Sequence, residues 1–262
     1  MAGELSIEPI KAFDDNYIWL LTREGCKDCV VVDPGDDDPV RAVLRERDLR
    51  LKAILITHKH GDHVGGVKGL KMDWPKAIVY GPKHEPITSV ERFLESGDIV
   101  ELKRLDLSFD VIDVPGHTEG HIAYYMPGVL FCGDTLFSCG CGRVFSGTFE
   151  QLSDSLLSLG ELPANTLVYC AHEYTQSNIG FAKWVEPDNL DLHVREERVA
   201  ELRAEGRPSV PSYLGEEFLT NPFMRTDEPA VIAAAERWVG HELNSPAEVF
   251  RALRTWKDKE YD

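Results

Sequence analysis

The chain lacks any apolar run near the roughly 18 residues that a membrane-spanning helix needs, so we expect no membrane partner. Its opening residues, MAGELS, contain no basic region followed by an apolar core. We therefore expect no signal peptide and a cytoplasmic protein. Lysine and arginine total 28 against 45 aspartates and glutamates, a formal net charge of −17. Because proteins bind nucleic acids largely through cations that neutralise phosphates, we expect no nucleic-acid partner.

The chain has 262 residues and six cysteines. We do not expect a disulfide framework, because such frameworks are typical of shorter, secreted chains. Cys26 and Cys29 have the spacing of a redox or zinc pair, but no second pair follows at zinc spacing. They lie between two strand-like runs, which favours a hairpin turn. We expect a monomer that binds any acidic small molecule through a local cluster of cations.

Two kinds of pattern divide the chain near residue 172. Branched and aromatic runs at 7–10, 17–22 and 30–33 predict an antiparallel meander, and strand and helix patterns then alternate. This alternation favours an α/β sandwich of sheets flanked by helices. The remaining chain has helical periodicity and no convincing strand. We predict an α/β domain over 1–172 and an all-helical domain over 173–262.

Local signals predict where several helices begin. Asp38-Pro39 is typical of a cap residue followed by proline at the first helical position. Thr148 and Gln151 have capping-box spacing. Ser245-Pro246 repeats the pattern of a cap residue followed by proline near the end of the chain.

The most informative stretch is Thr-His-Lys-His-Gly-Asp-His at 57–63, directly after the apolar run at 53–56. Ligands often collect at the carboxyl ends of buried strands in α/β sheets. His58 and His60 project to one side of an extended segment, whereas Asp62 and His63 are adjacent and must diverge. One ion cannot easily use all four donors, but two neighbouring ions can. The alternative, surface histidines on a turn, gains nothing from crowding imidazoles together.

Three further strand-like runs end in the same kinds of donor. The residues are His117 in Pro-Gly-His-Thr, Asp134 in Gly-Asp-Thr-Leu and His172 in Ala-His-Glu-Tyr. These segments can therefore add ligands to the site that the loop at 57–63 begins.

Together these motifs resemble the metallo-β-lactamase fold, an αββα sandwich. The segments at 12–17, 140–143 and 221–225 (AFDDNY, GCGR and NPFMR) narrow the resemblance to the glyoxalase II family, the hydroxyacylglutathione hydrolases. The likeness covers essentially the whole chain, including the helical tail, and implies a catalytic domain over 1–172 and a substrate-binding domain over 173–262.

The resemblance implies two divalent metal ions per chain. The first would be held by His58, His60 and His117, and the second by Asp62, His63 and His172, with Asp134 bridging them. Zinc is the leading candidate, and iron and manganese also suit imidazole and carboxylate ligands.

The family's activity would be hydrolysis of the thioester S-D-lactoylglutathione to glutathione and D-lactate, the second step of methylglyoxal detoxification. The nucleophile would be a hydroxide bridging the metals, with Asp62 and Asp134 as catalytic ligands. The resemblance also carries over four substrate-binding residues, Arg143, Tyr174, Arg254 and Lys257. Some members have a tyrosine where this chain has Phe145, so one hydrogen-bond donor to the glutathione part is missing.

Two other functions stay open. One is a mononuclear iron oxidoreductase of the same fold, the glutathione persulfide dioxygenase type, and the other is a metal-binding scaffold without activity. For Asp33 we weigh two roles, orienting the metal loop or capping a turn. The four histidines outside the matched set are expected to be structural or at the surface, with His121 the best placed to contact the ligands; they are His84, His121, His193 and His241.

Overall fold

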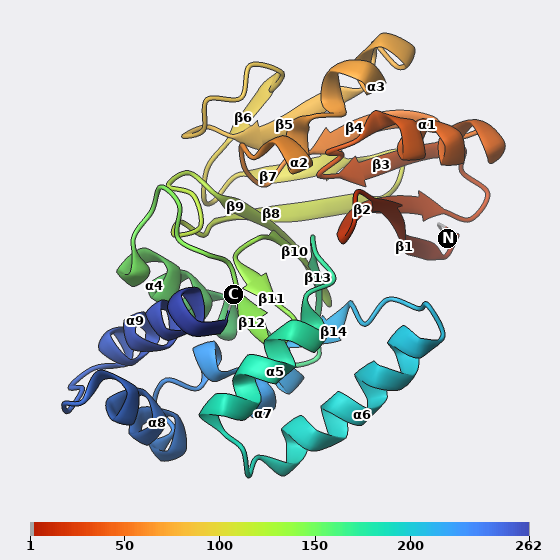
Figure 1. Ribbon diagram of the computed structural model, residues 1–262. Helices are drawn as coiled ribbons and strands as arrows, with labels where there is room; N and C mark the ends of the chain where they lie inside the picture. Colours follow the sequence, from red (N-terminus) through yellow and green to blue (C-terminus); the bar gives the residue numbers. More distant parts are fainter. Residues whose placement is uncertain (1–2, 262) are drawn as a thin grey trace. The chain divides into compact units, whose positions relative to one another are not determined.

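The computed structural model describes residues 3–261, which divide into two compact units (Figure 1). The first unit contains the chain up to Asp113 together with Gly120–Met126 and Leu130–Gly133. The second contains the two short intervening segments, Val114–Glu119 and Pro127–Val129, and the chain from Asp134 onward.

The first unit is built on a six-stranded mixed sheet with the order β1-β2-β3-β4-β5-β6. The first three strands are antiparallel neighbours, which confirms the predicted meander, and β3 to β6 run parallel. Its strands are β1 (Leu5–Ala12), β2 (Asn16–Arg23), β3 (Asp28–Val32), β4 (Arg50–Leu55), β5 (Ile78–Pro82) and β6 (Arg92–Leu94). The segment with Cys26 forms the turn between β2 and β3, and both Cys26 and Cys29 are free thiols, so the hairpin prediction is confirmed.

Two helices cover one face of this sheet, α1 (Asp37–Glu46) and α3 (Val67–Asp73). Their apolar residues, such as Val40 and Leu70, share one buried cluster with side chains of the strands. The predicted start of α1 at Asp38-Pro39 is wrong, because the cap is Asp36, whose carboxylate accepts a hydrogen bond from the Asp38 amide at 3.0 Å. Pro39 is tolerated within the first turn because amides there have no partner inside the helix.

A second sheet in this unit packs on the first. Its antiparallel strands are β7 (Ile99–Leu102), β8 (Leu107–Asp113) and β9 (Ile122–Met126), with β10 (Val129–Gly133) next to β9. Phe109 contacts the rings of Tyr124 and Phe131 at centroid distances of 6.4 and 6.1 Å. The Tyr124 hydroxyl donates to the carbonyl of Ile56 at 2.8 Å, directly after β4. Two sheets with helices on one outer face thus make up the unit.

The second unit is mostly helical, and its few strands are short. β11 (Leu136–Phe137) pairs with β12 (Gly140–Cys141), and β13 (Leu167–Cys170) pairs with β14 (Ser212–Tyr213). The expectation that no strand follows residue 173 is therefore wrong for β14. Two residues are too short to produce a detectable period-2 pattern.

Six α-helices are described in this unit. They are α4 (Phe149–Gly160), α5 (Thr175–Val185), α6 (Leu190–Ala204), α7 (Leu214–Thr220), α8 (Pro229–Val239) and α9 (Pro246–Trp256). The capping box at Thr148 is confirmed, with the reciprocal bonds to Gln151 measuring 3.1 and 2.9 Å. Ser245 caps α9 with proline at its first position, as predicted. Within the described residues, no helix is both long enough and apolar enough to cross a bilayer.

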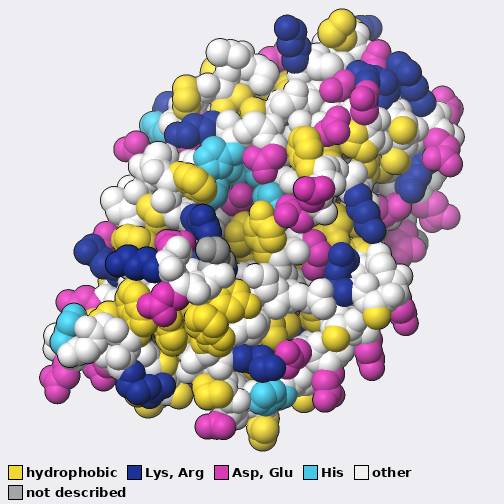
Figure 2. All heavy atoms as spheres, viewed as in Figure 1, with side chains coloured by type: hydrophobic (Ala, Val, Ile, Leu, Met, Phe, Trp, Pro, Cys, Tyr) yellow, Lys and Arg dark blue, Asp and Glu magenta, His cyan; other side chains and the backbone are white. Residues whose placement is uncertain are grey.

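The surface mixes charges and apolar groups. Figure 2 shows acidic and basic side chains interspersed over the visible face, with hydrophobic side chains gathered between them. In the second unit, partly exposed aromatic rings contact one another, with Trp184 at 6.3 Å from Trp256 and 4.9 Å from Tyr261. Such contacts cover part of the apolar surface of α5 and α9.

Candidate metal centre

The loop after β4 carries four of the predicted ligands in the first unit. β4 is buried along most of its length, and His58, three residues after its end, has no exposed surface. His60 is the cap residue of the short helix α2 (Gly61–Val64), which carries Asp62 and His63. His63 is buried, whereas His60 and Asp62 are partly exposed. The carboxyl end of a buried strand therefore presents all four donors, as the sequence predicted.

A buried carboxylate organises this loop. Asp33 accepts hydrogen bonds from the Thr57 amide at 2.8 Å and from the Thr57 hydroxyl at 2.7 Å. Its Oδ2 also lies 3.0 Å from Nδ1 of His63, and the Thr57 hydroxyl lies 3.1 Å from Nδ1 of His58. Both contacts are hydrogen bonds when His58 and His63 carry their proton on Nδ1, because the Thr57 hydroxyl and the Asp33 carboxylate are then the acceptors. Of the two roles weighed for Asp33, the structure supports orienting the metal loop.

This arrangement leaves the Nε2 atoms of His58 and His63 as potential ligands. Nε2 of His58 lies 3.1 Å from Nδ1 of His60, and Nε2 of His63 lies 3.3 Å from Oδ2 of Asp62. Asn16 donates to the same Asp62 oxygen at 3.0 Å. In metal sites, neighbouring side chains typically hydrogen-bond to the ligands and fix their orientation.

Close backbone packing holds Asp62 in place. A Cβ added to Gly35 would lie 1.8 Å from the Asp62 carbonyl oxygen, so only glycine fits between the end of β3 and α2. The same turn begins with Asp33, which adopts a φ of 51°. The Asp33-Pro34-Gly35 segment therefore positions the ligand loop through its backbone as well as its carboxylate.

His121 and Glu85 also contact the ligand loop. The ring of His121 is fully buried and stacks on His58 at 4.6 Å, in agreement with its predicted place beside the ligands. The buried carboxylate of Glu85 accepts from the Gly120 amide at 3.1 Å and lies 3.5 Å from Nζ of Lys59. Glu85 thus links the segment before His121 to the ligand loop.

In the second unit, Asp134 lies between two of the predicted ligands. Its Oδ2 is 3.5 Å from Nε2 of His117 and 3.4 Å from Nε2 of His172. Nδ1 of His117 donates to the carbonyl oxygen of Arg143 at 2.8 Å, which directs Nε2 toward Asp134. A Cβ on Gly142 would lie 2.0 Å from the Asp134 carbonyl and 3.0 Å from His117, so this position also requires glycine.

Aromatic rings support His172. Tyr174 stacks on its imidazole at 4.7 Å with an interplanar angle of 8°, and Phe137 meets both rings edge-on at 5.7 and 5.2 Å. Phe137 belongs to β11, so the β11–β12 hairpin is part of the support for this ligand.

A buried ion pair anchors that hairpin. Arg195 has 1% of its side chain exposed and donates to Glu217 at 2.5 Å and to the Ser138 hydroxyl at 2.7 Å. The second Glu217 oxygen accepts from the Cys139 amide at 2.7 Å and from Asn221 at 3.1 Å. Burial disfavours the charge on Arg195, but the neighbouring carboxylates of Glu217 and Glu216 outweigh it and raise the pKa of the guanidinium.

The four predicted substrate-binding residues all lie in the second unit, in different surroundings. Arg143 and Tyr174 are exposed, with 49% of the Arg143 side chain accessible. Arg254 and Lys257 are buried at the end of α9 and the π-helical turn η2 (Lys257–Tyr261), so neither is a solvated charge on the surface of a helix. Arg254 donates to the carbonyl of Cys141 at 3.1 Å and pairs with Asp258 at 2.9 Å.

The donors of each unit fit divalent metal ions. Imidazole nitrogens and carboxylate oxygens converge within each set, and partners on Nδ1 leave Nε2 of His58, His63 and His117 directed at other donors. Neutral imidazole with carboxylate is a ligand set for zinc, iron or manganese.

Sequence reasoning missed several residues that support the ligands. Asn16 and Glu85 in the first unit and Phe137, Arg195 and Glu217 in the second received no role from the sequence. Only Asn16 carried a signal, because it belongs to the AFDDNY segment of the resemblance. The others act through contacts between segments distant in the chain. For example, the bond from Cys139 to Glu217 spans 78 residues.

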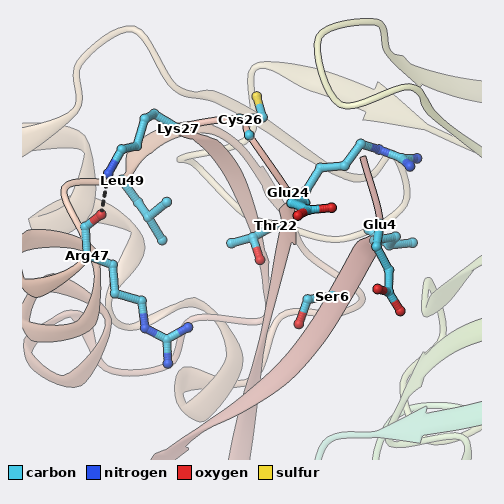
Figure 3. Close-up of a pocket in the computed structure, with 11 residues that line it drawn as sticks. Glu4, Ser6, Thr22, Glu24, Cys26, Lys27, Arg47 and Leu49 are labelled. Atoms are coloured by element: carbon cyan, nitrogen blue, oxygen red, sulfur yellow. Dashed lines mark hydrogen bonds between the residues drawn. The ribbon is translucent and has the colours of Figure 1, made fainter. Parts of the chain in front are cut away.

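A cavity of about 720 Å³ in the first unit lies away from the ligand loop (Figure 3). Its lining includes Lys27, directly before β3, and Leu49, directly before β4. The ligand loop, in contrast, follows the end of β4. Figure 3 shows Lys27 donating to the Arg47 carbonyl, a bond of 3.0 Å. Arg47 in turn pairs with Glu8 at 3.0 Å. These contacts engage Lys27 and Arg47, and the lining of the cavity contains none of the predicted ligands.

Comparison with known proteins agrees with this arrangement. Residues 13–172 match the model of the metallo-beta-lactamase superfamily, which is the class that the layered sheets and the histidine and aspartate sets define. Residues 173–260 match the model described as hydroxyacylglutathione hydrolase C-terminus. A hydroxyacylglutathione hydrolase of Vibrio cholerae serotype O1 is 51% identical over 255 residues, 97% of this chain and 99% of the relative. The chain belongs to the hydroxyacylglutathione hydrolase family.

Solved structures share the fold. ETHE1 from Myxococcus xanthus superposes with a TM-score of 0.68 at 24% identity, covering 98% of this chain and 93% of that one. TTHA1623, crystallised in a di-iron-bound form, has a TM-score of 0.53 at 28% identity over 63% of this chain and 91% of its own. The first likeness concerns the fold alone.

Proposed function

We propose that this chain hydrolyses S-D-lactoylglutathione to glutathione and D-lactate with two divalent metal ions, most simply zinc. The observation that carries the proposal is the complete set of seven donors, with Asp134 placed between two imidazole nitrogens at 3.5 and 3.4 Å. The family membership and the 51% identity to a relative of that name support the same activity.

The proposed ligand assignment uses both donor sets. His58, His60 and His117 would hold one ion, Asp62, His63 and His172 the other, and Asp134 would contact both. When bound, the ions would bring the pKa of a water molecule near neutrality and polarise the thioester carbonyl. TTHA1623 in its di-iron form offers a precedent for two metals on this fold.

The chain's own residues would orient the reacting groups. Asp33, Thr57 and the Arg143 carbonyl hold the Nδ1 protons of the ligand imidazoles, so their Nε2 lone pairs stay available. The leaving glutathione thiol has an ordinary pKa of about 8.5, so it departs as a thiolate without a dedicated general acid.

The glutathione part carries two carboxylates, which this acidic protein would bind with local cations. We assign that role to Arg143, Arg254 and Lys257, and we assign Tyr174 a further contact with the substrate. Three of the four lie beyond residue 173, in the part that matches the hydroxyacylglutathione hydrolase C-terminus, which supports the proposed catalytic region over 1–172 and substrate-binding region over 173–262. The monomeric state and the cytoplasmic location stay predictions.

The direct test measures cleavage of S-D-lactoylglutathione by purified protein together with elemental analysis. We expect turnover and two metal ions per chain. If the protein instead binds a single iron, consumes oxygen with glutathione persulfide and does not cleave the thioester, its function is that of a persulfide dioxygenase and the proposal is wrong. A metal-loaded protein inactive on both substrates would indicate a binding scaffold.

A further inference from the structure

An internal carboxylate lies among the cations assigned to the substrate. Oδ1 of Asp258 is 2.9 Å from a terminal nitrogen of Arg254 and 3.6 Å from Nε of Arg143. The Asp258 side chain is 31% exposed, whereas Arg254 has 1% of its side chain exposed. The buried guanidinium thus meets a buried oxygen, Oδ1, of a side chain that is otherwise partly exposed.

Arg254 is held in position by contacts other than this ion pair. One terminal nitrogen donates to the Cys141 carbonyl at 3.1 Å, and the guanidinium lies over the ring of Phe223 at 5.3 Å. Both of these contacts are with uncharged groups. Because a buried charge without a counter-ion is strongly destabilising, Asp258 supplies compensation that the carbonyl and the ring cannot.

Arg143 connects this cluster to a proposed metal ligand. Its carbonyl accepts the Nδ1 proton of His117 at 2.8 Å, while its half-exposed side chain reaches Asp258. A carboxylate held between Arg143 and Arg254 would therefore belong to a molecule bound beside His117. The proposed function assigns this position to one carboxylate of the glutathione thioester.

The contact of Asp258 is one that another anion can replace. Its Oδ1 faces both arginines, yet among the described residues no donor is aligned on that oxygen for a hydrogen bond. A substrate carboxylate free to turn can offer both oxygens to a guanidinium, and such bidentate pairs are stronger than a single misaligned contact.

We propose that Asp258 is an internal counter-ion that holds the place of a substrate carboxylate between Arg143 and Arg254 and competes with it. The inference rests on the proposed function, since it takes the glutathione part as the incoming anion. Asp258 compensates the two arginines while the site is empty, and it weakens binding of glutathione thioesters and of the glutathione product. It thereby sets affinity and aids product release without contacting the thioester.

The test compares Asp258→Asn with the metal-loaded parent and with Asp154→Asn, a control that removes the same charge from an exposed position on α4. The probes are S-methylglutathione, which cannot be hydrolysed as a thioester, and its diethyl ester, which lacks both carboxylates. We expect Asp258→Asn to bind S-methylglutathione about fivefold or more tightly than the parent and to lower KM and the inhibition constant of glutathione similarly. Affinity for the diester should not change, and Asp154→Asn should match the parent.

A second readout distinguishes competition from a positioning role. Without ligand, Asp258→Asn should melt at a lower temperature than the parent, and S-methylglutathione should raise its melting temperature more than it raises that of the parent. Unchanged or weaker binding of S-methylglutathione, or equal gains for the diester, would overturn the proposal. If Asp258→Asn does not fold, Asp258→Ser must show the same direction; failure of both to fold would make Asp258 a structural counter-ion and overturn competition.

The parent protein separates this failure from failure of the proposed function. A parent that cleaves S-D-lactoylglutathione and binds S-methylglutathione, combined with an Asp258→Asn variant that gains no affinity, rejects the inference alone. A parent that does neither rejects the function on which the inference rests.

Discussion

Oδ2 of Asp33 lies 3.0 Å from Nδ1 of His63, and the two side chains are buried together at the ends of β3 and α2. The same carboxylate holds Thr57, which in turn contacts His58. One residue outside the ligand set therefore orients two ligands.

We predict that Asp33→Asn weakens metal binding about 10- to 100-fold, because the amide cannot accept from both Thr57 and His63 as the carboxylate does. Chelator competition followed by elemental analysis measures the change independently of turnover. Asp14→Asn, at an exposed position before β2, is the matched control. Metal content equal to that of the parent at every chelator concentration would show that Asp33 acts only on the turn.

Asp134→Ala should lose metal and reduce turnover of the glutathione thioester by at least about 100-fold, since it removes the oxygen that faces two ligand imidazoles. Metal content and steady-state rates measure the two effects separately. Asp154→Ala changes an exposed aspartate of the same unit and should leave both unchanged. A variant that keeps its metals and its turnover would refute the bridging role.

Lys257→Ala should raise KM for the glutathione thioester about tenfold and change kcat little. The substitution removes a cation that we assign to the glutathione carboxylates and leaves the metal ligands unchanged. The control is Lys259→Ala, which removes an exposed lysine two positions further along the chain. Equal KM values for the two variants would remove Lys257 from the binding site.

Glu217→Gln should lower the free energy of unfolding by about 3–5 kcal/mol, because it leaves the buried Arg195 guanidinium without its closest counter-ion. Urea unfolding followed by fluorescence gives the value. Glu201→Gln, on the exposed side of α6, should change stability by less than about 0.5 kcal/mol. The measurement contradicts an anchoring role if both variants unfold at the parent's midpoint.

Stability should fall as the pH rises above about 9. Burial raises the pKa of Cys170 to about 12 and that of Cys141 to about 11, whereas thiols of an unfolded chain ionise near ~8.5. The folded state therefore holds these protons more tightly. This contribution is complete below the unfolded pKa and is lost as the pH approaches the folded values. The free energy of unfolding, measured with urea between pH 7.5 and 10.5, should fall less steeply with pH for Cys170→Ala than for the parent. Cys26→Ala, at a partly exposed position, should show the same pH dependence as the parent.

Local patterns were sufficient to predict most of the elements near the candidate site. The apolar run at 53–56 and the donors that follow it are adjacent in the chain, so the strand end and its ligands were predicted together. The predicted cap of α1 is two residues from the observed one, because Asp36 and Asp38 are both aspartates and the sequence does not distinguish them. Only the backbone conformation shows which carboxylate accepts from a first-turn amide. β14 was missed because it is a strand only through its pairing with β13.

By itself the sequence determined which donors and cations this protein has and at which strand or helix end each one stands, because strand alternation, helix periodicity and capping depend on neighbours within a few positions. Only the tertiary structure decided that Asp33 orients His63, that Glu217 holds the β11–β12 hairpin and that Asp258 lies against Arg254 and Arg143. For the first two the partners lie 30 and 78 positions apart, and for Arg143 and Asp258 the separation is larger still. Packing of the sheets and helices brings such residues together, and no local propensity specifies those distances.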